Sequence, residues 1–512
     1  MKINLLTDFT GHNDVLRGEF IAPAYQGKWM SLLVAGSSAA YLCSHWLQNK
    51  QNIPGPLRLP IVGSLPFIMG DLREVMTEMN KKYGDIFIIY VGSESIVVLN
   101  GLDTIKEALI QNEKLFDGRS QKQFQELTFN LGVASSQGDL WQEQRRFVLQ
   151  TLRNFGFGRR GMEDYISEEA IFLKKAVSSI DSNSPCDLYS ILIKCTCNVI
   201  CAVVKGQRFD YNDPQYTEYM NLSKEFLSLI GINNPVFVFQ LLKYIPGDLF
   251  GYKKAISISK DLRKLYKQWI DEHRNRLDNG EEPIDLIGVY LREMKKCKEE
   301  NQYFFDDQLV QVIMDLFLAG TDTTANTLTF AIMYLIIHPD IQNKIQDEID
   351  HVIGSHRKPT LKDRFNMPYT QAVINEVQRI TDIAPLAIPH ATTEDVLFRG
   401  YTISKGTTVI INLHSVLWDE HQFPEPSNFK PERFLDEKGN FSPCEAAIPF
   451  SLGKRACLAE SMAKAELFLL FVHLLQNFHF KLPPNHPELD FKGIIGLTVQ
   501  PKPFTVFVES RQ

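Results

Sequence analysis

A cysteine near the C-terminus, Cys457, offers the clearest chemistry in this chain. It follows a turn over residues 450–456 and opens an apolar helical run. A thiol at a helix start meets unpaired backbone N–H groups and the positive end of the helix dipole, which both favour the thiolate. Phe450 can shield the sulfur, Gly453 permits close approach of a flat ligand, and Arg455 can pair with its carboxylate. This pattern indicates a cysteine ligating haem iron; a buried structural thiol is the alternative.

A second pattern is an acid beside a hydroxyl, Asp322 and Thr323, within a strongly apolar helical stretch. Gly320 in this stretch lowers the stability of the helix by about 1 kcal/mol relative to alanine. The Thr323 hydroxyl can bond back to a carbonyl one turn earlier and widen the helix. An acid and an alcohol in such a groove can relay protons to a bound ligand. A threonine-rich N-cap after a helix break is the alternative, but the apolar residues on both sides favour one continuous helix.

Two further patterns are weak when taken alone. Glu376 and Arg379 are three residues apart on one predicted helix face, and Arg433 lies downstream in a proline-stiffened loop. A buried network of these three groups would leave neither arginine unpaired, as burial demands. Trp141 and Arg145 are four residues apart, so the indole N–H and the guanidinium can donate to one anionic group.

Length and composition predict one large globular unit. The 512 residues are 44% hydrophobic and 22% charged, and no Gly/Ser/Pro-rich linker divides the chain after residue 60. The net charge of −7 gives no sign of a nucleic-acid-binding protein. The eight cysteines form no CxxC pair, which indicates reduced thiols on a cytosolic body.

The N-terminal region predicts a membrane anchor. After an extension over residues 1–28, residues 29–47 carry no formal charge and would span about 28 Å as a helix. A cleaved signal peptide and an amphipathic surface helix are the alternatives. Residues 48–60 contain several prolines and are interpreted as a semi-rigid hinge. A single catalytic domain is expected over residues 61–512.

The elements that must position these residues are mostly helical. Residues 84–100 alternate as in a β-hairpin, and helical periodicity dominates from about 103 to 380. Short strands are expected over 384–414, followed by one long helix from Cys457 to about residue 477. Further short strands close the chain. The predicted fold class is mainly α, with small β-sheets at one side.

Together these segments resemble the cytochrome P-450 superfamily of haem-thiolate monooxygenases, in order and approximate spacing. The resemblance extends from the proline-rich segment to the C-terminus and implies haem b between a long central helix and the cysteine loop. Within the superfamily the chain resembles microsomal family 2. Residues 206–211, 315–324 and 384–390 look most like subfamily U, with subfamilies R and J next.

The resemblance assigns roles to individual residues. It implies Cys457 as the iron ligand, Asp322 and Thr323 as the proton-delivering pair, and three residues as a structural triad beneath the haem: Glu376, Arg379 and Arg433. It implies that the haem is bound by Arg119, Trp141, Arg145, His390, Phe450 and Arg455. The sequence departs from the family pattern at Ala459, where glycine is usual; one added methyl is compatible with a helix, so haem binding is expected to persist.

The resemblance also implies a reaction and its partners. One atom of O₂ would enter an unactivated C–H bond, with electrons from NADPH through NADPH-cytochrome P-450 reductase and cytochrome b5 as a second donor. The enzyme would sit on the endoplasmic reticulum membrane with its catalytic domain in the cytosol. A haem-thiolate peroxide isomerase or dehydratase is the rival enzyme class, and the Asp322–Thr323 pair favours the monooxygenase. Non-catalytic haem or lipid binding is a further alternative.

The expected substrate is a lipophilic small molecule, because the predicted pocket segments are largely apolar and rich in phenylalanine. Resemblance to subfamily U implies hydroxylation of long-chain polyunsaturated fatty acids near the methyl end. A sterol or vitamin-D-like side chain and foreign compounds are the alternatives. The segments expected to line the pocket are residues 120–130, 226–239, 317–319, 383–388 and 496–498.

Overall fold

The computed structural model describes residues 52–120, 125–154, 160–182, 184–230, 234, 236, 240–296, 302–484 and 486–511. The predicted extension, the anchor at residues 29–47 and the first part of the hinge lie outside these residues. From residue 51 onward the chain forms one compact unit. Among its described helices none has both the length and the apolar character needed to cross a membrane.

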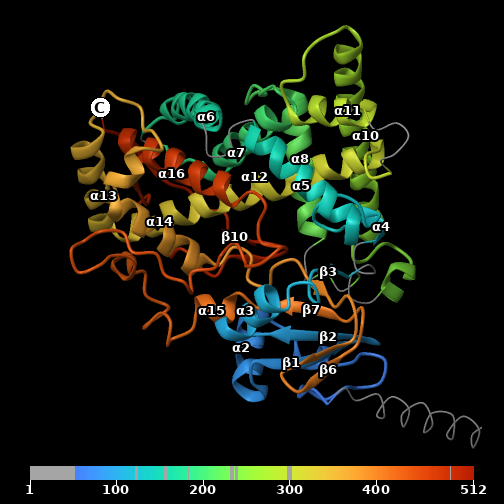
Figure 1. Ribbon diagram of the computed structural model, residues 1–512. Coiled ribbons are helices and arrows are strands. Elements are labelled where there is room, and N and C mark those ends of the chain that lie inside the picture. The colour runs from blue at the N-terminus through green and yellow to red at the C-terminus, as the bar shows by residue number, and fades with distance from the viewer. Residues whose placement is uncertain are drawn as a thin grey trace, which may run out of the picture. The chain divides into compact units, whose positions relative to one another are not determined.

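Helices make up most of this unit, which confirms the predicted fold class (Figure 1). The α-helices are α2 (Leu72–Tyr83), α3 (Leu102–Lys106), α4 (Gln125–Thr128), α5 (Gly138–Asn154), α6 (Arg160–Ser178), α7 (Leu188–Val204), α8 (Pro214–Leu229), α10 (Tyr252–Asp278), α11 (Leu286–Lys296), α12 (Asp306–Ile337), α13 (Pro339–Val352), α14 (Pro368–Thr381), α15 (His414–Leu417) and α16 (Glu460–Asn477). Shorter helical turns are η1 (Leu65–Phe67), η2 (Glu107–Gln111), η3 (Gln240–Tyr244), η4 (Asp363–Asn366) and η5 (Pro431–Phe434).

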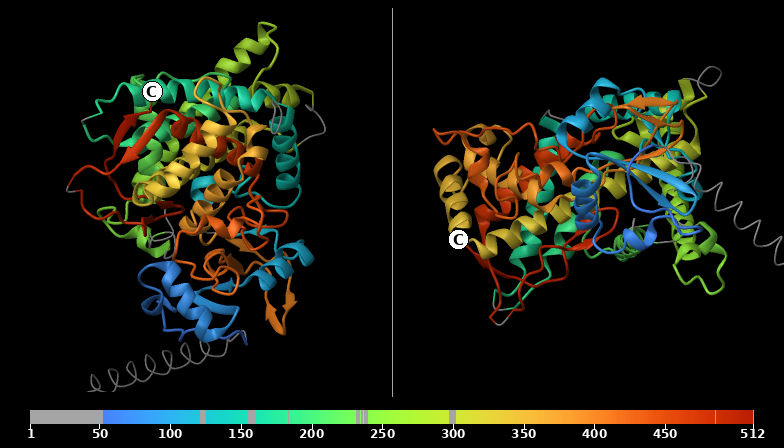
Figure 2. Two further views of the ribbon diagram at one scale, coloured as in Figure 1. Left: turned by 90° about the vertical axis from the view of Figure 1, so that its left-hand side faces the viewer. Right: turned by 90° about the horizontal axis from the view of Figure 1, so that it is seen from below.

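The largest sheet of the described residues has the strand order β1-β2-β7-β4-β3. Its strands are β1 (Ile86–Val91), β2 (Glu94–Leu99), β3 (Gly118–Arg119), β4 (His390–Ala391) and β7 (Thr408–Ile411). The two-stranded sheets pair β5 (Val396–Phe398) with β6 (Tyr401–Ile403), β8 (Phe478–Lys481) with β11 (Phe507–Ser510), and β9 (Ile494–Ile495) with β10 (Val499–Gln500). The predicted hairpin is confirmed by the antiparallel pairing of β1 and β2. Strands β1 and β2 lie apart from the helices around α12 and α16 (Figure 1; Figure 2, left).

The described part of the proline-rich segment packs on β1. The N–H of Ile88 donates a 2.8 Å hydrogen bond to the carbonyl of Pro54, and Ile53 is buried. A Cβ at Gly55 would lie 2.0 Å from the Ile88 carbonyl oxygen, so this contact requires glycine. Residues 53–55 therefore belong to the packed body, whereas the whole of residues 48–60 was predicted to be a hinge.

The central helix α12 carries the candidate proton-delivering pair. It runs without a break from Asp306 to Ile337, which confirms the expectation of one continuous helix through Asp322 and Thr323. Pro339 sets its end, because proline disfavours helical backbone angles at the preceding residue, and His338 has φ −124° and ψ 68°. The site is built along the middle of this helix.

Gly320 allows α12 to approach α7 closely. A Cβ at position 320 would lie 2.4 Å from Cδ1 of Ile200, closer than side chains pack. Beside this contact, the hydroxyl of Thr196 donates a 2.9 Å hydrogen bond to the Thr321 carbonyl. The cost of glycine inside a helix is thus offset by helix packing. The contact also fixes the rotation of α12 about its axis, and with it the face that α12 presents to the site.

Candidate active site

The loop that carries Cys457 lies between η5 and α16 and is held by short-range hydrogen bonds. The Cys457 N–H donates to the Phe450 carbonyl at 2.9 Å, and the Ala456 N–H donates to the Gly453 carbonyl at 3.1 Å. Gly453 has φ +75°, and a Cβ there would lie 2.1 Å from the carbonyl oxygen of Leu109. Packing on the turn at residues 107–111 therefore explains the glycine at position 453. The sequence had indicated a different reason, namely contact of Gly453 with a flat ligand.

The thiol of Cys457 is exposed, yet its surroundings raise its pKa. Burial by neighbouring protein is the largest cause, and the backbone N–H of Ala459 and the guanidinium of Arg145 oppose it without cancelling it. The Cys457 residue is open to solvent, yet many protein atoms surround its sulfur. Both are expected of a sulfur that faces a space enclosed by protein. A metal ion bound to this sulfur would hold it as the thiolate. Ala459 caps α16 with φ −99° and ψ 17°, angles that do not require glycine.

Three arginines from different elements gather beside this loop. Arg119 lies on β3, Arg145 on α5, and Arg455 two residues before Cys457. Burial lowers the pKa of all three, and repulsion by Arg119 and Arg145 lowers that of Arg455 further. Their described acceptors are backbone carbonyls: Arg119 Nε donates to Ala134 (2.9 Å), Arg145 Nη2 to Ala456 (2.8 Å), and Arg455 Nε to Asp117 (2.7 Å). Such a concentration of buried positive charge favours an anionic ligand.

Two buried donors in this cluster have no acceptor in the described part of the chain. They are the indole Nε1 of Trp141 and the Nη1 of Arg455. The two side chains stack, with the guanidinium carbon of Arg455 3.7 Å from the centre of the Trp141 ring. Buried donors without acceptors are uncommon and costly. Carboxylates of a bound ligand would satisfy them, so the donor set fits the propionates of haem.

His390 faces the same cluster from β4. Its Nδ1 is 2.7 Å from the Phe116 carbonyl, so Nδ1 carries a proton and Nε2 is the second polar atom of the ring. Burial lowers the pKa of His390 well below its ordinary value, and the charges of Arg119 and Arg455 add to the effect. A neutral His390 brings no further positive charge to the arginines. Pairing of β3 with β4 places Arg119 directly opposite His390.

Asp322 is buried and hydrogen-bonded away from its neighbour Thr323. It accepts hydrogen bonds from Thr498 Oγ1 (2.5 Å), Gln500 Nε2 (3.1 Å) and Asn326 Nδ2 (2.9 Å). Burial raises the pKa of this carboxyl group, and the hydrogen bonds oppose that rise without cancelling it. In this arrangement Asp322 contacts the segment around β10, so the two members of the predicted relay point in different directions.

Thr323 lies on the face of α12 that is open to solvent. Its hydroxyl donates a 2.8 Å hydrogen bond to the Ala319 carbonyl, the back-bond expected from the sequence. Ala319 is exposed and Thr323 is half-buried, although residues 324–335 of the same helix are buried. Other elements leave the middle of α12 partly uncovered, and this uncovered surface is where a ligand of the enzyme can lie.

The predicted triad is brought together in the interior. Nε and Nη2 of Arg379 donate to the two carboxylate oxygens of Glu376, at 2.7 and 2.8 Å, and both side chains are fully buried. Arg433 Nε donates to the same carboxylate at 3.1 Å. Arg379 also donates to the carbonyls of Leu417 and Pro426. The network ties α14 to the segment that precedes the cysteine loop.

Two predicted pocket residues are core residues. Phe226 is 2% and Phe317 is 1% exposed. The Phe317 ring packs 5.4 Å from the ring of Trp269 and 5.8 Å from that of Tyr219, within an aromatic cluster of α8, α10 and α12. The expectation that these phenylalanines line the pocket is therefore wrong, and the reason is that residue 317 lies on a different face of α12 from Ala319.

Sequence reasoning missed Asp315, a half-buried carboxyl group on α12. It accepts hydrogen bonds from the N–H groups of Val133 (2.8 Å) and Ala134 (2.9 Å), and so fastens the loop before α5 to the central helix. Burial raises its pKa to about 6. The one available sequence signal was an acid placed a single turn before Ala319 in an apolar helix. Burial also raises the pKa of Asp117. Sequence reasoning missed this residue because no local pattern marks it.

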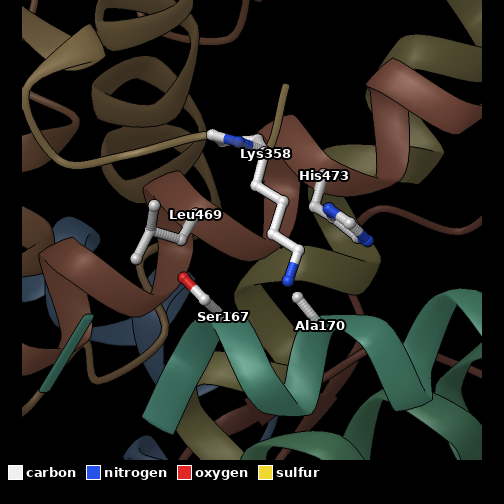
Figure 3. Close-up of a pocket in the computed structure, with 6 residues that line it drawn as sticks. Ser167, Ala170, Lys358, Leu469 and His473 are labelled. Atoms are coloured by element: carbon white, nitrogen blue, oxygen red, sulfur yellow. The ribbon is translucent and has the colours of Figure 1, made fainter. Parts of the chain in front are cut away.

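A cavity of about 10 Å³ lies between α6 and α16, lined by Ser167, Ala170, Lys358, Pro359, Leu469 and His473 (Figure 3). This volume holds one water molecule. Burial is the largest cause of the lowered pKa of His473, about 4, and the positive charges of Lys174 and Lys358 add to it. The cavity shares no residue with the candidate site and is too small for a substrate.

The fold and the cysteine loop define a haem-thiolate enzyme, and comparison with known proteins identifies its family. A family model described as "Cytochrome P450" matches residues 53–508, and the chain belongs to this family. Cytochrome P450 2C3 of Oryctolagus cuniculus is 42% identical over 449 residues, which cover 86% of this chain and 89% of the relative. Cytochrome P450 2C8 of Homo sapiens is 41% identical over 482 residues, covering 91% and 97%.

The chain is therefore a cytochrome P450 monooxygenase. It binds haem through a cysteine thiolate and receives its electrons from a reductase. The names of its relatives agree with the family-2 resemblance found in the sequence. These relatives are members of subfamily C, whereas the sequence motifs look most like subfamily U.

Proposed function

We propose that Cys457 is the iron ligand and that the basic cluster holds the haem propionates. The residues of this binding set are Arg119, Trp141, Arg145, His390, Phe450 and Arg455. Bound haem supplies the redox chemistry that places one atom of O₂ in a C–H bond. The orphaned donors Trp141 Nε1 and Arg455 Nη1 carry the assignment, since each requires an acceptor that the described protein does not offer. The triad of Glu376, Arg379 and Arg433 supports the loop.

In this proposal Thr323 steers protons and Asp322 supplies them. The Thr323 hydroxyl faces the open side of α12, and breaking its bond to the Ala319 carbonyl frees it to donate toward a ligand. Asp322 has a raised pKa and is linked through Thr498 and Gln500 to the segment around β10. A change of Asp322 side-chain conformation would connect the two groups.

Replacing Thr323 by alanine is expected to uncouple electron flow from product formation. NADPH is still consumed, hydrogen peroxide rises, and product per NADPH falls by about tenfold, less than the ~100-fold typical of a lost proton donor because water can replace the hydroxyl. Thr329→Ala is the matched control, because Thr329 makes the same bond to a carbonyl four residues earlier. Unaltered coupling in Thr323→Ala would remove Thr323 from the mechanism.

For the substrate we propose long-chain polyunsaturated fatty acids, hydroxylated near the methyl end. The observation that carries this is the surface of α12 over residues 316–323. Its partly or fully exposed side chains are uncharged, namely Leu316, Leu318, Ala319 and Thr323, while Asp322 is buried. Such a surface suits a hydrocarbon chain and itself offers a carboxylate no charged partner. A sterol-like side chain and foreign compounds are the alternative substrates.

Mass spectrometry of the products tests this assignment. The reconstituted enzyme, given arachidonate, NADPH and reductase, is expected to oxidise carbons next to the methyl end, because the apolar tail alone fits beside Thr323. A sterol and an uncharged drug-like compound serve as competing substrates. Oxidation confined to carbons near the carboxylate, or turnover of the sterol without fatty-acid turnover, would contradict the assignment.

For location we propose the endoplasmic reticulum membrane, with residues 29–47 as a single N-terminal anchor and the catalytic domain in the cytosol. NADPH-cytochrome P450 reductase is the proposed donor, with cytochrome b5 as a second electron source. The packing of residues 53–55 on β1 supports the boundary, since the folded body begins there. The assignment to subfamily U stays a prediction.

Deleting residues 1–50 is expected to convert an integral protein into an extractable one. The full chain should resist carbonate extraction, whereas most of the truncated chain should be released from the membrane. The truncated chain should still bind haem, because the contacts of the folded body begin at Ile53. A haem spectrum of the truncated chain controls for folding. Equal extraction of both proteins would rule out residues 29–47 as a spanning anchor.

A further inference from the structure

Four side chains hold the Asp322 carboxyl group, and two of them are hydroxyls. It accepts hydrogen bonds from the hydroxyls of Thr498 (2.5 Å) and Tyr189 (3.4 Å), and from the amides of Gln500 (3.1 Å) and Asn326 (2.9 Å). A side-chain amide nitrogen only donates hydrogen bonds, whereas a hydroxyl can accept one proton while it gives up another. The two hydroxyls are therefore the described partners through which Asp322 can exchange a proton.

These hydroxyls bind different oxygens of the carboxyl group. Tyr189 donates to Oδ1, and Thr498 donates to Oδ2. Asp322 itself is only 2% exposed, so a proton from solvent has to reach it through a partner. Thr498 belongs to the segment 496–498, which the sequence predicts to line the substrate pocket, where an apolar ligand displaces water. A route from solvent that stays open when substrate is bound therefore has to pass through Tyr189.

Tyr189 connects the protein surface to this buried acid. It lies in the first turn of α7, a helix that runs beside α12 (Figure 1) and begins after the exposed N-cap Asp187. Tyr189 is half-buried, and Ser190 beside it is exposed. The Nζ of Lys224, an exposed lysine of α8, lies 5.8 Å from the centre of the Tyr189 ring. Part of the phenol ring thus adjoins solvent, while its hydroxyl contacts Asp322.

We propose that Tyr189 is the entry point for the protons that Asp322 delivers. The inference rests on the proton-delivery role proposed above for Asp322 and Thr323, and it adds the group that returns a proton to the acid from solvent. Tyr189 acts on the reaction only through Asp322, so it is a positioning residue.

The step moves one proton and leaves Tyr189 unchanged. The phenol oxygen takes a proton from a hydronium ion, which becomes water, while its own O–H proton passes to Oδ1 of the Asp322 carboxylate. Burial raises the pKa of Tyr189, and the charge of Asp322 adds to the effect, so the hydroxyl stays protonated and able to donate. At 3.4 Å the hydrogen bond is long for two oxygens, and such bonds often shorten when an enzyme is loaded with substrate.

The first measurement follows the carboxyl proton itself, by infrared spectroscopy of the full-length haem-loaded enzyme. The C=O band of protonated Asp322 is the band that Asp322→Asn removes, and its shift in D₂O reports exchange of the proton with solvent. Tyr189→Phe keeps the ring and removes only the hydroxyl, so this exchange is expected to slow by about tenfold. Tyr211→Phe is the matched control, because the Tyr211 hydroxyl also donates to a buried carboxylate, that of Glu169, at 2.6 Å. This control should exchange like the wild type.

The second measurement is the coupling of NADPH consumption to product, in H₂O and in D₂O. In Tyr189→Phe, product per NADPH is expected to fall by about tenfold while hydrogen peroxide rises. The solvent isotope effect on product formation should increase, because proton uptake by Asp322 becomes slow. Thr498→Val removes the other hydroxyl and shows whether protons enter there instead.

The outcomes separate this inference from the proton-delivery role of Asp322. If Tyr189→Phe exchanges and couples like the wild type while Asp322→Asn is uncoupled, Asp322 keeps its role and the entry through Tyr189 is overturned. Slow exchange in Thr498→Val with normal exchange in Tyr189→Phe also overturns it. If Tyr211→Phe falls as far as Tyr189→Phe, the loss is a general effect of a missing tyrosine hydroxyl. Full coupling in Asp322→Asn would remove both proposals. Slow exchange confined to Tyr189→Phe supports the inference.

Discussion

Cys457→Ser is expected to lose the thiolate-type absorption band of the reduced, carbon monoxide-bound protein. A serine hydroxyl does not ionise at neutral pH and is a much harder ligand than a thiolate, so it cannot replace the sulfur. Monooxygenase turnover should fall by at least about 100-fold, since even loss of a supporting group around a metal costs 10- to 100-fold. The spectrum and the rate of product formation are measured on the same preparation.

Cys444→Ser is the matched control for this change. Cys444 is a half-buried free cysteine thirteen residues earlier in the segment that leads to the same loop. Its replacement should leave both the absorption band and turnover near the wild-type values. Circular dichroism checks that both variants retain their helices. A Cys457→Ser protein with an unchanged thiolate band would show that another cysteine is the ligand.

The second large effect is expected for Arg379→Leu, which breaks the buried network below the cysteine loop. Glu376 would keep Arg433 and the Lys430 N–H as partners, at 3.1 and 3.0 Å, but lose both of its bonds to Arg379. Removing one member of a fully buried ion pair costs about 3–5 kcal/mol of unfolding free energy. The shift of the urea midpoint of unfolding, at constant slope, measures the lost free energy of unfolding. The fraction of protein that retains haem is measured alongside it.

Arg274→Leu is the control for position and spacing. Arg274 pairs with Asp271 three residues earlier on α10, the same spacing as Arg379 and Glu376, but on the surface. Exposed ion pairs of this kind contribute about 0–1 kcal/mol to the free energy of unfolding. The urea midpoint of Arg274→Leu should therefore stay close to that of the wild type. A midpoint for Arg379→Leu close to that of Arg274→Leu would contradict the role of the network in stability.

The sequence by itself determined the features that depend on spacing along one element. The i,i+3 pair of Glu376 and Arg379, the back-bond of Thr323 and the continuous helix through Asp322 follow from helical geometry, which repeats every 3.6 residues. The β1–β2 hairpin was predictable for a similar reason, since its partners are adjacent in the chain. The turn before Cys457 carried its own signal in glycine and aromatic positions.

Only the tertiary structure decided which distant groups meet. The parallel pairing of β2 with β7 and the contact of Arg263 with Gln311 join segments far apart in the chain, and no local pattern encodes them. The direction of Asp322 and the burial of Phe317 depend on how α12 is rotated, which its contact with α7 at Gly320 fixes. A sequence specifies which faces a helix has, but packing against its neighbours decides which face looks into the site.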